Sequence, residues 1–220
     1  MRVSEARHAA VGAQYKAVVI GGSAGGIKAL AAILSALPKD FALPVLAVQH
    51  LHSSDDGTFA SHVASLTRLL VVEPCDKARI EPGRLYTAPA NYHMLVERDF
   101  SISLSVEERV NWSRPSIDVL FESAALAWGE AVVAVILSGA NPDGAKGIRV
   151  VKKAGGLTIA QDPADAESRV MPQAAIDTGA VDKVLRDEEI GRLLAELGVR
   201  VNKTLQFLNR TTLMQTCDTK

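Results

Sequence analysis

Hydrophobic and polar positions alternate between two kinds of segment along most of the chain. Short apolar runs without polar alternation are typical of strands that a parallel sheet buries on both faces. These runs lie at 16–20, 43–50, 71–74, 131–139, 157–161 and 182–185. Segments with apolar residues three or four positions apart indicate helices. They lie at 27–38, 58–69, 143–155, 171–180 and 187–198. The alternation predicts a doubly wound α/β fold, with a mainly parallel sheet and helices on both faces.

Residues 80–106 interrupt this alternation. Three short strand-like runs, at 83–89, 92–97 and 101–106, are joined by small turns, which is typical of an antiparallel hairpin insert. After them, apolar residues at positions 117, 120, 121, 124 and 128 mark one face of a helix. We expect that helix to pack against the sheet.

The composition is that of one globular domain. The chain has 220 residues, of which 48% are hydrophobic, and a formal net charge of -1, so it lacks the strongly basic face of a nucleic-acid binder. Cys75 and Cys217 lie far apart, which argues against a disulfide scaffold or a zinc site. No apolar run reaches the roughly 18 residues of a membrane span, and the first residues do not form a secretory signal. We therefore expect a cytoplasmic protein.

We expect three parts in the chain. Residues 1–15 form an N-terminal arm, residues 16–198 the catalytic domain, and residues 199–220 a polar C-terminal tail. The helix at 187–198 is expected to end at Gly198. The tail is either one more helix or partly disordered.

The glycine-rich stretch "VVIGGSAGGIKAL" at 18–30 joins the first predicted strand to the first predicted helix. A dinucleotide-binding fingerprint needs a second glycine where Ser23 stands, and an acidic residue after the next strand, where the chain has Gln49 and His50. No G-K-[ST] follows, so a P-loop is excluded as well. Two interpretations remain open: a structural corner, or a turn that presents a nucleophile.

The nucleophile interpretation rests on "GGSAG", which satisfies the G-x-S-x-G pattern of a sharp strand-to-helix turn. A serine needs a base within hydrogen-bond reach, and His50 ends the next strand. A third group must orient the imidazole. Asp143 and Asp162 both follow strands and are the two candidates. The chain order Ser…His…Asp differs from the Ser…Asp…His order of α/β-hydrolases.

The histidines do not indicate a metal site. His50 and His52 form an H-x-H step, which on an extended segment directs the two rings to opposite faces. His62 and His93 have no useful spacing to them. We expect neither a metal nor a cofactor, and we expect His52 to lie in the loop beyond the strand.

Seven segments in this order resemble the catalytic domain of CheB-type chemotaxis methylesterases, over residues 16–198. The segments are "VVIGGSAGGIKAL", "VLAVQH", "IEPGRLYTAPANYHM", "RPSIDVLFESAA", "VVAVILSGANPDGAKG", "TIAQDP" and "VMPQAAIDTGA". The resemblance implies that Ser23 is the nucleophile, His50 the base and Asp143 the third member of a triad. Asp162 is then a turn residue.

The resemblance also implies the substrate. Enzymes of this family are protein-glutamate methylesterases and glutaminases that act on the cytoplasmic helices of methyl-accepting chemotaxis receptors. The loop after the strand at 131–139 is expected to help form an oxyanion hole, with Gly139, Ala140 and Asn141 near the substrate beside Ala24. Members of the family often have Thr where this chain has Ala24, and Met and Gly where it has Ala140 and Asn141.

Two further expectations follow from comparison with that family. Its two-domain members carry an N-terminal receiver domain, and only about 15 residues precede the first strand here, so we expect a separate regulator in trans. The alternatives to a receptor methylesterase are a serine hydrolase of the same fold that acts on another ester or amide, and a non-catalytic binding module.

Overall fold

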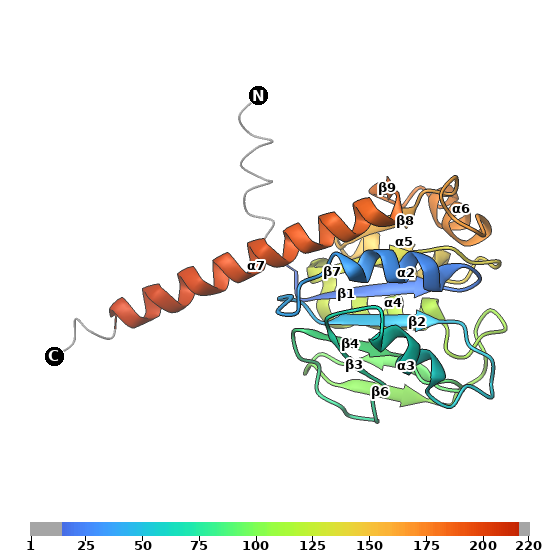
Figure 1. The fold of residues 1–220 in the computed structure, drawn as a ribbon, viewed down its shortest axis with the longest axis horizontal. Helices are drawn as coiled ribbons and strands as arrows, with labels where there is room; N and C mark the ends of the chain where they lie inside the picture. The colour runs from blue at the N-terminus through green and yellow to red at the C-terminus, as the bar shows by residue number, and fades with distance from the viewer. Residues whose placement is uncertain (1–14, 216–220) are drawn as a thin grey trace.

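The computed structural model describes the chain from residue 15 to residue 215, without the side chains of residue 203 and residues 205–215. Within this part, seven parallel strands form one sheet, in the order β3-β4-β2-β1-β7-β8-β9 (Figure 1). Their bounds are β1 Ala17–Gly22, β2 Val45–Gln49, β3 Leu70–Val72, β4 Arg84–Thr87, β7 Val132–Ile136, β8 Leu157–Gln161 and β9 Lys183–Leu185. The predicted doubly wound α/β fold is confirmed.

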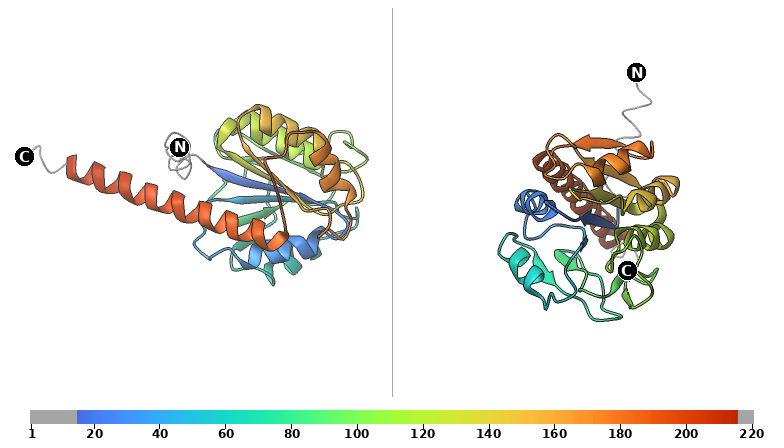
Figure 2. Two further views of the ribbon diagram at one scale, coloured as in Figure 1. Left: turned by 90° about the horizontal axis from the view of Figure 1, so that it is seen from above. Right: turned by 90° about the vertical axis from the view of Figure 1, so that its right-hand side faces the viewer.

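Helices cover both faces of the sheet (Figure 2). One face carries α2 Gly26–Ser35, α3 Thr58–Ala64 and α7 Asp187–Gln215. The other carries α4 Ile117–Trp128, α5 Ala145–Lys153, α6 Val170–Asp177 and the antiparallel hairpin of β5 His93–Val96 and β6 Ile102–Ser105. A short 3-10 turn, η2 Gly129–Ala131, leads from α4 into β7.

The central strands are apolar throughout because successive side chains enter two different cores. In β1, Val18 and Ile20 pack with α2 and α7, whereas Ala17 and Val19 pack with α4. All four are at most 1% exposed. A strand buried on both faces has no position that favours a polar residue, which is why the run reads as continuous apolar sequence.

The hairpin insert is smaller than the sequence predicts. The run at 83–89 is not part of it: it contains β4, which pairs in parallel with β2 and β3 in the main sheet. Leu85 and Tyr86 are adjacent, and each is buried in a different core. The insert is therefore limited to β5 and β6. With Arg84 and Thr87 as its first and last residues, this four-residue strand has too short an apolar run to be distinguished from a hairpin strand.

Two predicted helix ends were wrong. α3 ends at Ala64 rather than at 69, and α7 continues past Gly198 to Gln215. At Gly198 an added Cβ would lie 2.5 Å from Cε2 of Phe41. This glycine therefore allows close packing inside the helix instead of ending it. The predicted tail is largely a continuation of α7, and residues 216–220 and 1–14 lie outside the described part.

The order of the strands defines a switch point between β1 and β7. From β1 the chain first builds the β2 side of the sheet and later the β7 side. The loops that follow β1 and β7 leave the carboxyl edge in opposite directions, and open α/β sheets bind their ligands at such a place. Across residues 15–215, no helix is long and apolar enough to cross a membrane.

Candidate active site

Ser23 follows β1 directly and lies at this switch point. Its N–H donates to the carbonyl of Ser138, beyond β7, at 2.9 Å, and its carbonyl accepts from Nε2 of Gln49 at 2.7 Å. On the other side, the N–H of His50 donates to the carbonyl of Gly22 at 3.1 Å. Gly22 pairs with Gln49, so Ser23 and His50 occupy equivalent positions one step beyond the ends of neighbouring strands.

The glycines around Ser23 are required by space as well as by conformation. Gly25 has a φ of 75°, and an added Cβ would lie 2.5 Å from Cβ of Glu167 and 2.7 Å from Oγ of Ser138. A Cβ at Gly26 would lie 2.8 Å from Oε1 of Gln49. The turn is therefore packed closely against the loops behind it, which holds Ser23 at the carboxyl edge of the sheet.

His50 is paired with the carboxylate of Asp143. Nε2 of His50 lies 2.8 Å from Oδ2 of Asp143, and the two side chains are 12% and 0% exposed. Asp143 lies in the loop between β7 and α5, across the switch point from His50. Because Nε2 contacts Asp143, Nδ1 is the ring nitrogen of His50 that remains available to a nucleophile.

The carboxylate of Asp143 is surrounded by donors at the N-terminus of α4. Its oxygens accept from the N–H of Ile117 at 2.7 Å, the N–H of Asp118 at 3.3 Å and the hydroxyl of Ser116 at 2.9 Å. Ser116 is the N-cap residue of α4 but does not cap that helix with its own side chain. Asp143 thus caps α4 from a different loop, where the helix terminus stabilises negative charge.

Asn111 joins two buried carboxylates. Its Nδ2 donates to Asp143 and to Asp118, both at 2.8 Å. Burial by itself raises the pKa of Asp143, but the bonds from His50, Asn111 and the N–H of Ile117 outweigh it and hold that pKa below the ordinary value. Burial raises the pKa of Asp118, only partly offset by the N–H of Gly147. Asp143 is therefore the carboxylate kept ionised beside His50.

Two polar side chains lie near the free nitrogen of His50. Oγ of Ser113 is 3.5 Å from Nδ1, and Nδ2 of Asn141 is 3.4 Å from it. Ser23 Oγ makes no hydrogen bond with any described residue, and its nearness to His50 follows from the strand register. Bonds between a nucleophile and its base are often long before substrate binds. Ser113 is thus within hydrogen-bond distance of His50 and Ser23 is placed beside it by strand register, so distance alone does not assign the nucleophile.

The predicted oxyanion residues divide into two groups. The N–H of Gly139 already donates to the carbonyl of Ser168 at 3.1 Å, so it is not available to a substrate. In the part of the chain that the structure describes, the N–H groups of Ala24 and Ala140 have no partner, and both residues are exposed. Asn141 contributes its side chain: Oδ1 accepts from the N–H of Asp143 at 3.1 Å while Nδ2 faces His50.

Asp162, His62 and His93, which the sequence analysis also considered, make no hydrogen bond with the His50–Asp143 pair. Oδ1 of Asp162 accepts from the N–H of Ala164 at 2.9 Å, which makes it a turn residue after β8. His62 is exposed on α3. His93 is buried, where Nδ1 accepts from the N–H of Ser116 and Nε2 lies 3.0 Å from the carbonyl of Glu108.

Sequence reasoning missed Asn111, Ser113, Ser116 and Gln49. The signal for Asn111 is weak but physical: the "VNWS" segment places Asn at a turn position that tolerates a positive φ, and its φ is 50°. Ser116 was recognisable as a helix N-cap. That its hydroxyl serves Asp143 instead depends on how the β7 loop approaches α4.

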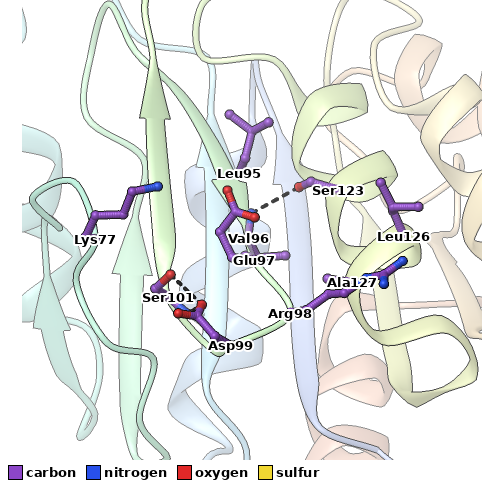
Figure 3. Close-up of a pocket in the computed structure, with 10 residues that line it drawn as sticks. All are labelled: Lys77, Leu95, Val96, Glu97, Arg98, Asp99, Ser101, Ser123, Leu126 and Ala127. Atoms are coloured by element: carbon purple, nitrogen blue, oxygen red, sulfur yellow. Dashed lines mark hydrogen bonds between the residues drawn. The ribbon is translucent and has the colours of Figure 1, made fainter.

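A hollow of about 240 Å³ opens beside His50, lined by His52, Asn91, Arg109, Trp112 and Arg114 among others. A larger hollow of about 580 Å³ lies between the β5–β6 hairpin and α4 (Figure 3). Its two serine hydroxyls are committed locally, Ser101 to Asp99 and Ser123 to the backbone. It contains no predicted site residue, whereas the smaller hollow is lined by His50.

Comparison with known proteins points the same way. The CheB methylesterase family model matches residues 18–194. A protein of Leptospira interrogans is 46% identical over 183 residues, which cover 83% of this chain and 95% of that protein. A protein-glutamate methylesterase/protein-glutamine glutaminase 2 of Anaeromyxobacter dehalogenans is 42% identical over 185 residues, 84% of this chain but 54% of that longer protein.

A solved structure has the same fold. The crystal structure of the Thermotoga maritima CheB methylesterase catalytic domain superimposes with a TM-score of 0.79 at 34% identity, and the match covers 83% of this chain and 98% of that domain.

Proposed function

The chain belongs to the CheB methylesterase family, and on this premise we propose that Ser23, His50 and Asp143 form its catalytic triad. The activity is that of a protein-glutamate methylesterase, which removes methyl esters from glutamate side chains and releases methanol. The observation that carries the assignment is the 2.8 Å contact between His50 and Asp143, beside a serine on the neighbouring strand end. We propose that residues 16–198 make up the catalytic domain, and that α7 extends beyond it to Gln215.

In the first half of the reaction, Ser23 Oγ attacks the ester carbonyl carbon. His50 takes the serine proton on Nδ1, because Nε2 is held by Asp143. The tetrahedral oxyanion is stabilised by the N–H groups of Ala24 and Ala140, which have no partner among the described residues. The tetrahedral intermediate then expels methoxide, which receives the proton from His50 and leaves as methanol, and a glutamyl-serine ester remains.

In the second half, water attacks the glutamyl-serine ester. His50 removes a proton from the water and returns it to Ser23 Oγ as the glutamate carboxylate leaves. The ionised carboxylate of Asp143 stabilises the imidazolium in both halves, which is consistent with its lowered pKa. The same sequence applied to a side-chain amide releases ammonia and would account for glutaminase activity.

The substrates are methyl-accepting chemotaxis receptors, and we propose that their cytoplasmic helices carry the target glutamates. The enzyme then acts in the cytoplasm. The alternative, a hydrolase of the same fold with another ester or amide as substrate, is favoured by one observation. The resemblance implies other residues at Ala24, Ala140 and Asn141; Ala24 follows Ser23 directly, and the side chain of Asn141 faces His50.

Methanol release from methylated receptor membranes tests this function. We expect release by the wild-type protein and loss of release with Ser23→Ala. Release from model esters without release from receptors would support the alternative substrate, and unchanged release by Ser23→Ala would reject Ser23 as the nucleophile.

A further inference from the structure

The segment that anchors Asp143 also presents an unusually exposed tryptophan. Val110 and Ser113 exchange backbone hydrogen bonds at 3.2 and 2.9 Å, so residues 110–113 form a two-residue hairpin turn. We call it the Trp112 turn. Its central residues, Asn111 and Trp112, have φ values of 50° and 64°. Positive φ at both central positions is the type I′ pattern, in which the second position favours glycine.

Trp112 is therefore costly for the fold in two ways. Its backbone is in the left-handed region, which is strained for a residue with a β-carbon, and the residue is 93% exposed, so it gains little by burial. The turn itself is firmly anchored, because Asn111 donates to Asp143 and Asp118. Residues held in such a conformation at a rigid site often serve function rather than stability. The ring is available to a molecule that approaches His50.

The hollow beside His50 is positively charged. Its lining includes Arg109, Arg114 and His52, and no aspartate or glutamate side chain lines it. Arg114 is committed, since Nη1 donates to the carbonyls of Val106 and Glu107 at 2.6 and 2.9 Å. Arg109 is exposed and has no ion-pair or hydrogen-bond partner among the described residues. A guanidinium in this state is suited to bind a carboxylate.

We propose that Arg109 and Trp112 form a specificity site for a protein segment with a carboxylate next to the target glutamyl ester. Arg109 pairs with that neighbouring carboxylate, and the ring of Trp112 covers the apolar part of the segment. This inference rests on the proposed function, because it places the scissile ester at Ser23 and His50. It goes further by defining which glutamyl esters are preferred.

Two synthetic peptides test the site. Both carry one γ-methyl glutamate, flanked by glutamate in one peptide and by glutamine in the other. We expect wild-type kcat/KM to be about tenfold higher for the acidic peptide, since an ion pair that excludes some water contributes about that factor. Arg109→Gln should abolish this preference. Arg98→Gln, an arginine on the distant β5–β6 turn, should retain it.

Trp112→Gly provides a second, independent measurement. Glycine relieves the left-handed backbone, so the thermal midpoint should stay the same or rise by about 2–4 °C. KM for the acidic peptide should nevertheless rise about tenfold. A purely structural tryptophan would give the opposite result, a lower midpoint with an unchanged KM.

The outcomes separate this inference from the function on which it rests. Equal kcat/KM for the two peptides, or a preference that survives in Arg109→Gln, would overturn the specificity site while the esterase assignment stands. If the wild-type protein hydrolyses neither peptide nor free glutamate γ-methyl ester, the esterase assignment and the specificity site both fail.

Discussion

Nε2 of His50 lies 2.8 Å from Oδ2 of Asp143, although the two residues are 93 positions apart in the chain. Asp162, which also follows a strand, instead closes its own turn. We therefore expect Asp143→Asn to lower kcat by about 10⁴-fold, because the imidazole loses its orienting charge. Asp162→Asn should keep kcat within about threefold of the wild-type value. The measurement is kcat for methyl-ester hydrolysis, with far-ultraviolet circular dichroism to confirm folding. Equal losses in the two variants would reject the assignment.

The two serines near His50 can be told apart by activity. Ser113 Oγ is 3.5 Å from Nδ1 of His50, whereas the position of Ser23 follows from strand register. We expect Ser23→Ala to lower kcat by at least about 10⁴-fold, as loss of a nucleophile does. Ser113→Ala should cost less than about tenfold. Labelling by a fluorophosphonate, followed by peptide mapping, checks the same point, and a label on Ser113 would reverse the assignment.

The capping of α4 by Asp143 has a consequence for acid stability. Hydrogen bonds hold the pKa of Asp143 below its ordinary value of about 3.9 in the folded protein. Its carboxylate therefore contributes stability that is present above about pH 4 and is lost as pH falls through the lowered pKa. The free energy of unfolding should fall more steeply below about pH 4 in the wild-type protein than in Asp143→Asn.

Urea unfolding from pH 2 to pH 7 measures this difference. The pKa of Asp118 is raised by burial and in smaller part by the charge of Asp143, so its contribution has the opposite sign and is partly relieved in Asp143→Asn. Parallel curves for wild type and Asp143→Asn would show that Asp143 does not contribute to acid stability.

The glycine turn before α2 should be sensitive to a single methyl group. Gly25→Ala combines a positive φ with a Cβ 2.5 Å from Cβ of Glu167, so we expect a loss of about 3 kcal/mol in unfolding free energy. Gly57 has a φ of 96° but no atom within 4 Å of an added Cβ. Gly57→Ala should therefore cost only the backbone strain, about 1 kcal/mol. Equal losses in urea denaturation would mean that packing against Glu167 is unimportant.

Gly198 should reverse the usual effect of a helix glycine. Glycine to alanine inside a helix normally stabilises by about 1 kcal/mol. Here the new Cβ would lie 2.5 Å from the ring of Phe41, and we expect Gly198→Ala to destabilise by about 1 kcal/mol. Val199 is 50% exposed on the same helix, and Val199→Ala should stabilise by about 0.5 kcal/mol. Thermal unfolding checks the pair, and a higher midpoint for Gly198→Ala would contradict the packing argument.

Local sequence patterns were sufficient to predict an element where a residue type has a single structural role. Continuous apolar runs such as 131–139 identified strands buried on both faces, and the spacing of residues 117–128 identified α4. They were insufficient where one residue type serves two purposes. A glycine such as Gly198 commonly marks the end of a helix, but here it allows close packing against Phe41. The apolar run of β4 is too short to predict which strands it pairs with.

The sequence by itself determined the layers of this protein and the edge of the sheet where its chemistry lies. Strands without polar positions need a helix layer on each face, and parallel strands bring their carboxyl ends to one edge. The family resemblance already implied that His50 and Asp143 act together, and the tertiary structure gives their contact. Only the tertiary structure decided that Asn111 joins Asp143 to Asp118 and that the Trp112 turn lies beside them. These contacts join distant loops. These loops come together because of the strand order and the packing of α4, and neither of these produces a periodic pattern in the sequence.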